Sequence, residues 1–153
     1  MKTLLAAVDF SDASAKVISK AHELAKALSA RIVFVHIVEP VANYVPVGAA
    51  MDVIETTPPP MVELDTEPQK KRLNGFVEAA TQAGIGAEAH VILGLPAEEI
   101  VTAAESQGAD TILIGSHGHG ALYNLFAGSV VTGILKRSEI PVLVVPIPKK
   151  DER

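Results

Sequence analysis

The sequence has 153 residues and a formal net charge of -5; 48% of the residues are hydrophobic, 20% are charged and none is Cys. This composition excludes a disordered chain, disulfides, thiolate metal sites and Cys nucleophiles, and the length fits one domain with one core. Nucleic acid is a disfavoured partner, because the acidic charge and the 4% aromatic content, without Trp, offer neither a surplus of cations nor stacking platforms.

The apolar segments are short. The longest runs, such as residues 32–38, cannot span a bilayer. The first residues begin a strand-like block and do not resemble a charged leader followed by an apolar segment. We therefore expect a cytoplasmic protein that is not membrane-embedded.

Five β-rich blocks divide the chain. Most are continuous apolar runs, the pattern of strands that are covered on both faces. The predicted strands are Leu4–Val8, Ile32–Val38, Ala87–Leu93, Thr111–Ile114 and Val142–Val145.

Helical patterns lie between these blocks. Apolar residues repeat with a 3.6-residue period from Asp12 to Leu28, and Ser11 or Asp12 is placed to cap the start. A second pattern includes residues 73–80 and ends before Gly84. The third and fourth helices are predicted from Pro96 to just before Gly108, and from Gly128-Ser129 to about Arg137.

The alternation of strand and helix predicts the fold class. Four repeats indicate an α/β three-layer sandwich, in which a five-stranded parallel sheet with right-handed crossovers carries helices on both faces. Ligands bind such sheets at the carboxyl ends of the strands, above all where the strand order reverses. The loops after Val8, Val38, Leu93 and Ile114 are therefore the places to look for a site.

We expect residues 1–148 to form a single domain and residues 149–153 to form a charged tail. Near residues 40–68 the chain is rich in Pro and has no clear period, which rules out a long regular element there. Two interpretations of this Pro-rich excursion stay open: a lid over a neighbouring site, or a variable surface segment.

The stretch from Ile114 to Gly120 contains three glycines and is followed by Gly128-Ser129. A glycine-rich loop between a strand and a helix exposes backbone N–H groups that can converge on phosphate oxygens, and a helix start adds its own amides. Glycines also serve ordinary turns between strand and helix, so this spacing alone leaves both interpretations open. The loop is neither a Walker loop nor the Rossmann fingerprint, because it lacks Gly-Lys-Ser/Thr and follows the fourth strand.

The combination of motifs resembles the ATP-binding branch of the universal stress protein family, and the resemblance extends through most of the chain. The residues that carry it are Gly115-x2-Gly118-x9-Gly128-Ser129, Ala7-Val8-Asp9-Phe10-Ser11, His36-Ile37, Gly94-x-Pro96, Ala109-Asp110-Thr111-Ile112 and Pro141-Val142-Leu143-Val144-Val145.

The resemblance implies the strand order 3-2-1-4-5 and ATP, with Mg²⁺, as the ligand. It implies that glycines and Ser129 hold the phosphates, that Asp9 lies near the ribose or a phosphate-bound metal, and that Ala7 and Ile37 line an adenine pocket. Val130 would lie beside the phosphate helix. The candidate nucleotide-binding residues are Ala7, Asp9, Ile37, Ile114, Gly115, His117, Gly118, His119, Gly128, Ser129 and Val130.

Several polar residues have alternative interpretations. Asp9 could instead cap the helix that follows it. His117 and His119 could bind a metal or contact phosphate, although zinc sites need a third ligand. We expect His22 to be a solvated position on the first helix, and His36 and His90 to be strand histidines with satisfied hydrogen bonds.

Neither loop that would meet the triphosphate contains Lys or Arg, and rapid phosphoryl transfer needs positioned cations. We therefore expect a stress-response or regulatory protein that senses or holds ATP, with no enzymatic activity beyond slow hydrolysis. The alternatives are an adenylating or pyrophosphate-releasing enzyme on the same fold, and a protein-interaction module without nucleotide.

The predicted partners follow from the last strand, Val142–Val145, which would be an apolar sheet edge. An exposed edge favours pairing, so we expect a homodimer through this strand, as the family also suggests. The sequence does not distinguish this dimer from a tetramer, and it does not identify the protein client or transporter.

Overall fold

The computed structural model describes residues 1–40, 64–116 and 128–147. His117, Gly118 and His119 lie outside the described residues, as do most of the Pro-rich excursion and the charged tail. The elements are β1 (Thr3–Ala7), α1 (Asp12–Leu28), β2 (Arg31–Val38), α2 (Glu67–Gln82), β3 (Ala87–Leu93), α3 (Pro96–Ser106), β4 (Thr111–Gly115), α4 (Ser129–Arg137) and β5 (Val142–Val145).

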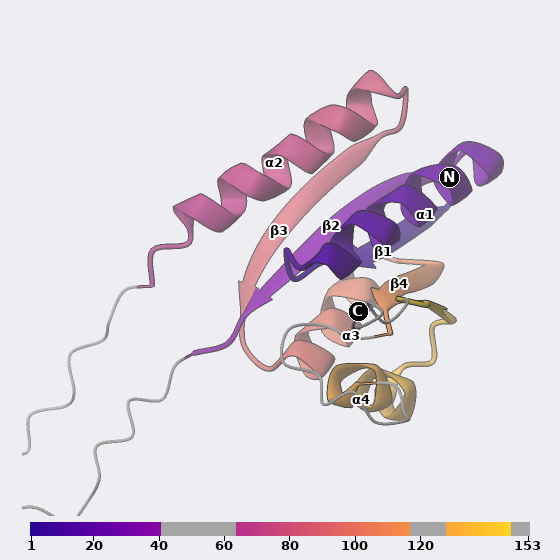
Figure 1. Ribbon diagram of the computed structural model, residues 1–153. Coiled ribbons are helices and arrows are strands. Elements are labelled where there is room, and N and C mark those ends of the chain that lie inside the picture. Colours follow the sequence, from indigo (N-terminus) through magenta and orange to yellow (C-terminus); the bar gives the residue numbers. More distant parts are fainter. Residues whose placement is uncertain (41–63, 117–127, 148–153) are drawn as a thin grey trace, which may run out of the picture.

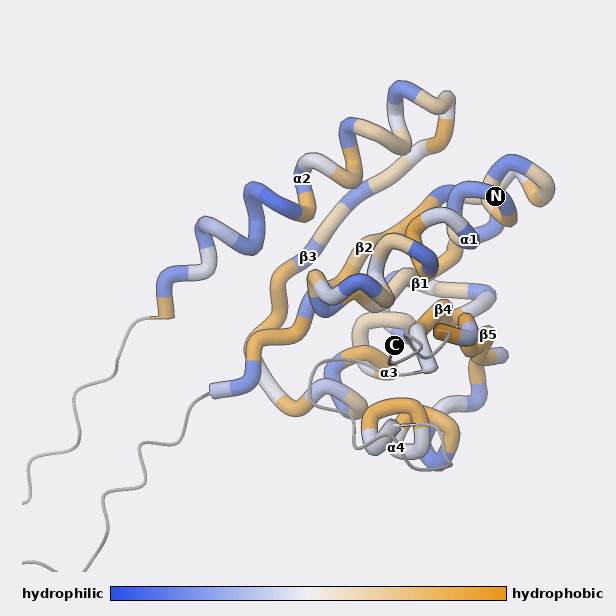
Figure 2. The backbone as a smooth tube through the Cα atoms, viewed as in Figure 1, coloured by the Kyte–Doolittle hydropathy of each residue, from blue (hydrophilic) through white to orange (hydrophobic). Residues whose placement is uncertain are grey.

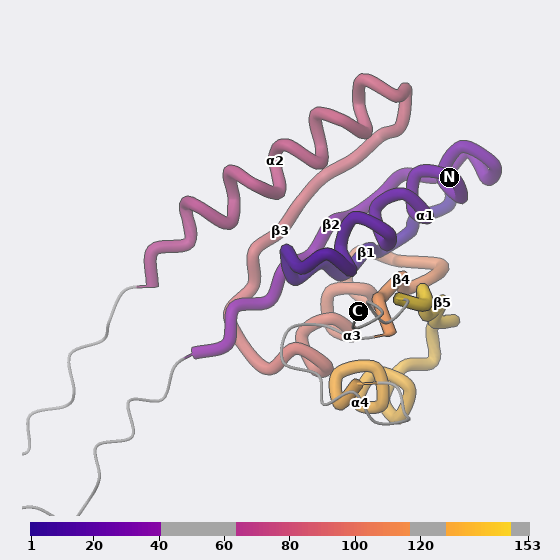
Figure 3. The backbone as a smooth tube through the Cα atoms, viewed as in Figure 1, coloured from indigo at the N-terminus to yellow at the C-terminus, as the bar shows by residue number. Residues whose placement is uncertain are grey.

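The five strands form one parallel sheet in the order β3-β2-β1-β4-β5. The predicted fold class and strand order are confirmed. β1 pairs with β2 on one side and with β4 on the other, so the strand order reverses between β1 and β4. Figure 3 traces the chain through this arrangement, with β5 returning beside β4.

Helices cover both faces of the sheet (Figure 1). On one face α1 and α2 pack over a core that includes Phe34 and Leu73. On the other face α3 and α4 pack over a core that includes Val33 and Ile112. Burial of these apolar side chains is the main stabilising contribution to the fold. In Figure 2 hydrophobic residues run along the sheet, whereas α2 is hydrophilic over much of its length.

α2 begins at Glu67, earlier than the apolar pattern at residues 73–80 predicted. Pro68 lies in its first turn, where the missing N–H has no intrahelical partner to lose. The preceding Asp65 accepts a hydrogen bond from the Glu67 N–H at 3.0 Å. The first two turns of α2 are polar and exposed, so no apolar period marks them in the sequence.

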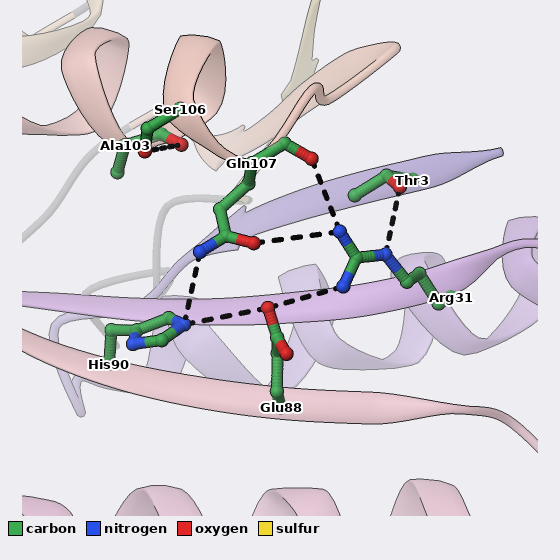
Figure 4. A network of polar contacts seen from close by, with 7 residues as sticks. All are labelled: Thr3, Arg31, Glu88, His90, Ala103, Ser106 and Gln107. Atoms are coloured by element: carbon green, nitrogen blue, oxygen red, sulfur yellow. Dashed lines mark hydrogen bonds and ion pairs between the residues drawn. The ribbon is translucent and has the colours of Figure 1, made fainter.

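A network of polar side chains connects the amino ends of β1, β2 and β3 to the end of α3 (Figure 4). The guanidinium of Arg31 donates to the Thr3 hydroxyl at 3.0 Å and to the Gln107 carbonyl at 3.2 Å, and it pairs with Glu88 at 3.2 Å. The Glu88 carboxylate also lies 3.5 Å from His90 Nε2. One side chain on β2 therefore links β1, β3 and α3.

Two predicted strand histidines have hydrogen-bond partners, as expected. His36 Nδ1 lies 2.8 Å from the Val8 carbonyl, and His90 Nε2 lies 3.4 Å from Gln107 Nε2. The prediction for His22 is wrong. Its ring is partly buried on α1 with its centroid 6.5 Å from that of Phe34, and Nε2 is buried without a hydrogen-bond partner in the described structure.

The environment of His22 makes stability depend on pH. Burial, and then the nearby charge of Lys26, lower the pKa of His22 from its ordinary value of 6.5. The unfolded chain therefore binds the proton more readily than the folded chain. The contribution of His22 to the free energy of unfolding is fully present above about pH 6.5, the ordinary pKa that applies to the unfolded chain. It decreases as the pH falls from there toward the lower pKa of His22 in the folded chain.

We expect His22→Leu to flatten this dependence. Urea unfolding followed by circular dichroism between pH 7.5 and 5.5 should show a loss of wild-type stability that is smaller in the variant. Parallel wild-type and variant curves over this range would contradict the assignment to His22.

α3 and α4 approach closely at Gly133. A Cβ built on Gly133 would lie 2.7 Å from the Cβ of Ala97, a separation that requires the helices to shift. Gly75, within α2, has no atom within 4 Å of a Cβ built at its position. These two helical glycines form a matched pair for testing the contact.

We expect Gly133→Ala to lower the free energy of unfolding by about 1–3 kcal/mol, because overpacking separates the helices. Gly75→Ala, the control, should raise it by about 0.5–1 kcal/mol through helix propensity alone. Urea unfolding of both variants measures the difference. A similar increase in the free energy of unfolding of both variants would show that α3 and α4 do not pack as described.

Candidate functional site

A cavity of about 320 Å³ lies at the carboxyl ends of β1, β2 and β4, where the strand order reverses. The starts of α1, α3 and α4 contribute to its wall. The lining residues are Ala7, Val8, Asp9, Ala13, Ser14, Val17, Val35, His36, Ile37, Glu39, Pro96, Ile100, Ile114, Gly115, Ser116, Gly128, Ser129, Val130 and Val131.

The cavity brings together every candidate residue that the structure describes. They are Ala7, Asp9, Ile37, Ile114, Gly115, Gly128, Ser129 and Val130. They come from the ends of three strands and the start of α4, which are far apart in the sequence.

The start of α4 is fixed to the end of β4. The Gly128 N–H donates to the Ser116 carbonyl at 3.1 Å, and the first hydrogen bond of the helix joins the Thr132 N–H to the Gly128 carbonyl at 3.0 Å. No described side chain caps this helix start. Helix geometry leaves the amides of residues 129–131 without an intrahelical acceptor, at the positive end of the helix dipole.

The backbone conformation at residue 128 does not require glycine, since φ is -53°. Among the described residues, a Cβ at this position would meet the Ser116 carbonyl oxygen, at 3.7 Å, which is an ordinary contact. These residues therefore leave room for a Cβ here. What a larger side chain would occupy is the cavity beside the α4 amides.

Ser116 holds three segments together, and the sequence analysis did not single it out. Its N–H donates to the Val145 carbonyl at 2.9 Å, and its hydroxyl accepts from the Ile147 N–H at 3.1 Å. Together with the bond to Gly128, these contacts tie β4 to α4 and to the exit of β5. A serine within a glycine-rich loop gives no spacing signal for such a role.

Asp9 is held rigidly at the end of β1. Its Oδ1 accepts hydrogen bonds from the Ser11 N–H at 3.0 Å, from the Ser11 hydroxyl and from the Ser14 hydroxyl at 3.0 Å. Oδ1 therefore accepts from the residue before α1 and from two hydroxyls and does not cap an amide of the helix, and Asp9 also lines the cavity. Ser11 occupies the N-cap of α1, but its hydroxyl bonds to Asp9 and not to the helix.

One wall of the cavity is apolar. Ala7 and Ile37 face the α3 side of the sheet, where they belong to the same core cluster as Val35 and Ile100. Ala7 and Ile100 are buried, and Ile37 is partly buried. A flat apolar group of a ligand would replace solvent against this wall.

A second hollow adjoins the first. It is lined by Asp9, Phe10, His36, Pro68, Gln69 and Arg72, so Asp9 and His36 belong to both. The guanidinium carbon of Arg72 lies 4.1 Å from the centroid of the Phe10 ring. Phe10 has a left-handed backbone, with φ of 61°, which directs its ring between His36 and Phe76. Sequence reasoning missed Arg72, because nothing local connects α2 with the end of β1.

Among the described residues, no three His, Asp or Glu side chains gather as a metal site. No helix in those same ranges is long and apolar enough to cross a membrane.

The fold and the position of the cavity define a doubly wound α/β protein with a cavity at the reversal of strand order, the place where such sheets bind ligands. The model of the universal stress protein family matches residues 1–146. The chain belongs to the universal stress protein family.

Curated relatives carry the same family name. Universal stress protein MJ0577 of Methanocaldococcus jannaschii is 38% identical over 80 residues, 52% of this chain and 49% of that protein. MJ0531 of the same organism is 30% identical over 98% of this chain and 85% of its own length. A universal stress protein of Thermus aquaticus is 35% identical over 94% of this chain and 98% of its own length.

Solved structures share the fold. The structure of MJ0577 superimposes with a TM-score of 0.76 at 23% identity and covers 97% of this chain and 98% of that one. A universal stress protein in complex with cAMP gives 0.68 at 22% identity, covering 95% and 96%. One from Archaeoglobus fulgidus in complex with dAMP gives 0.66 at 22% identity, covering 94% and 97%.

Proposed function

We propose that this protein binds ATP at the cavity and acts as a regulatory nucleotide-binding protein. The observation that carries the proposal is the start of α4, whose amides lie beside Gly128 at a cavity that also has an apolar wall. Such an arrangement suits a ligand with an anionic end and a flat apolar end. The cAMP and dAMP complexes of two structural neighbours favour an adenine nucleotide as that ligand.

Each lining group has a distinct task in this proposal. The phosphates are held by Gly115, Gly128 and Ser129, together with Gly118, which lies outside the described residues. Val130 lies beside the phosphates. Ala7, Ile37 and Ile114 surround the adenine and exclude water. Asp9, oriented by Ser11 and Ser14, accepts a hydrogen bond from a ribose hydroxyl.

Mg²⁺ would enter with the triphosphate and supply neutralising charge there. Asp9 is the proposed protein contact. Because Oδ1 of Asp9 already accepts three hydrogen bonds, we assign most of the metal's ligands to phosphate oxygens. His117 and His119 stay candidates for phosphate contact.

We propose that the protein binds ATP without rapid hydrolysis or phosphoryl transfer. The described lining of the main cavity contains neither Lys nor Arg, so no described cation there can neutralise a phosphoryl group in transfer. ATP would act by favouring one state of the loops around it, which a cytoplasmic client or transporter then reads. Release of AMP to an acceptor during steady turnover would instead support the adenylating alternative.

Gly128→Val tests the phosphate cradle. We expect it to weaken ATP binding by about 100-fold or more, because the side chain displaces charge-assisted hydrogen bonds from the α4 amides. The free energy of unfolding should fall by about 0.5–2 kcal/mol, since valine is a poorer N-cap residue than glycine. Isothermal titration calorimetry gives the affinity, and Gly75→Ala is the control. Undiminished ATP affinity in Gly128→Val would refute the site.

We also propose a homodimer through β5, which lies at the edge of the sheet. The Pro141 and Val145 carbonyls accept from β4, so the alternate residues Val142 and Val144 direct their backbone groups toward the open edge. Leu143 is 36% exposed on the same strand. An apolar edge whose outward backbone groups have no hydrogen-bond partner among the described residues favours pairing with a second copy.

Val144→Pro should convert the dimer into a 16.0 kDa monomer without losing a bond to β4, because it removes an outward N–H. Val144→Thr keeps that N–H and should stay dimeric. Sedimentation equilibrium at micromolar concentration distinguishes the two. A wild-type monomer, or a dimeric Val144→Pro variant, would exclude pairing through β5.

A further inference from the structure

We propose that the hollow beside Asp9 binds a second phosphate, one esterified to the ribose of the nucleotide at its 2′ or 3′ oxygen. The inference rests on the proposed function, because it requires an adenine nucleotide in the main cavity. It concerns residues of α2 that do not belong to the proposed phosphate site at Gly128, chiefly Arg72.

The position of the hollow relates it to the sugar. The proposed phosphate site at Gly128 lies on the β4 side of β1. Arg72 lies on the other side of β1, because it comes from α2, which packs on β2 and β3. Asp9, the proposed ribose contact, lines both spaces. A substituent on a ribose hydroxyl can therefore extend past Asp9 into the hollow while the 5′-phosphates stay at α4.

Arg72 has the chemistry that such a substituent needs. Its guanidinium carbon lies over the Phe10 ring, 4.1 Å from the centroid, a cation–π contact that leaves guanidinium N–H groups for an anion. Among the residues that the structure describes, no carboxylate forms an ion pair with Arg72. An arginine beside a nucleotide ribose is a known solution for holding a phosphate on the sugar.

Two further features of the hollow agree with this ligand. Because a carbonyl only accepts, the contact of His36 Nδ1 with the Val8 carbonyl assigns a proton to Nδ1 and leaves Nε2 as the ring nitrogen that can contact the remaining ribose hydroxyl. Pro68 and Gln69 place the positive end of the α2 dipole at the same hollow. The carboxylate of Asp9 opposes an anion, but three donors to its Oδ1 reduce its field.

Calorimetry with the purified full-length protein tests the proposal directly. The ligands are AMP, adenosine 2′,5′-bisphosphate and adenosine 3′,5′-bisphosphate, each with ATP as the competitor. One bisphosphate should bind about tenfold or more tightly than AMP, the contribution expected of hydrogen bonds to a charged group. Which bisphosphate gains identifies the oxygen that faces Arg72.

Substitutions on α2 separate recognition from structure. Arg72→Gln should bring the ratio of AMP to bisphosphate dissociation constants close to one with little change in AMP affinity. Lys71→Gln, at an exposed neighbour that does not line the hollow, should keep the wild-type ratio. Arg72→Lys keeps the charge without the planar group and should give an intermediate ratio.

The outcomes distinguish this inference from the function on which it rests. If AMP binds and ATP displaces it, but neither bisphosphate binds more tightly, the second phosphate site is excluded and the nucleotide site stands. Retention of the preference in Arg72→Gln also excludes it. If no adenine nucleotide binds, both proposals fail together.

Discussion

The site depends on one hydrogen bond, from the Gly128 N–H to the Ser116 carbonyl. It joins the first turn of α4 to the end of a central strand, and Ser116 is in turn bonded to Val145 and Ile147. Because a helix start carries unpaired amides wherever it lies, its position decides whether those amides serve a ligand or water. Here a rigid sheet sets that position.

The strand reversal explains why a space exists at this place. From the end of β1 the chain turns to α1 on one face, and the chain enters α4 on the other face after β4. Two adjacent strands thus send their connections to opposite sides, and none of the described helices fills the region between their carboxyl ends. The apolar wall near Ile37 and the polar start of α4 are consequences of the same topology.

The sequence predicted features that depend on local pattern. Continuous apolar runs identified all five strands, and the bounds of α1 and β3 were predicted correctly. The start of α2 was missed because its first turns bury no apolar stripe. The burial of His22 and the stacking of Arg72 on Phe10 depend on how α1, α2 and β2 meet, which no spacing along the chain records. The grouping of the described candidate residues around one cavity followed from motif resemblance together with strand order.

The distribution of charge around the two hollows separates binding from catalysis. In the proposed complex the terminal phosphate meets backbone amides, which carry partial charges and no full positive charge. The one full cation described beside the site, Arg72, lines the hollow on the α2 side and not the cavity wall with Gly128. Its charge therefore acts on what is attached to the sugar. In the proposed complex a cation so placed would select among nucleotides, and no described Lys or Arg would lie beside the γ-phosphate to assist rapid transfer.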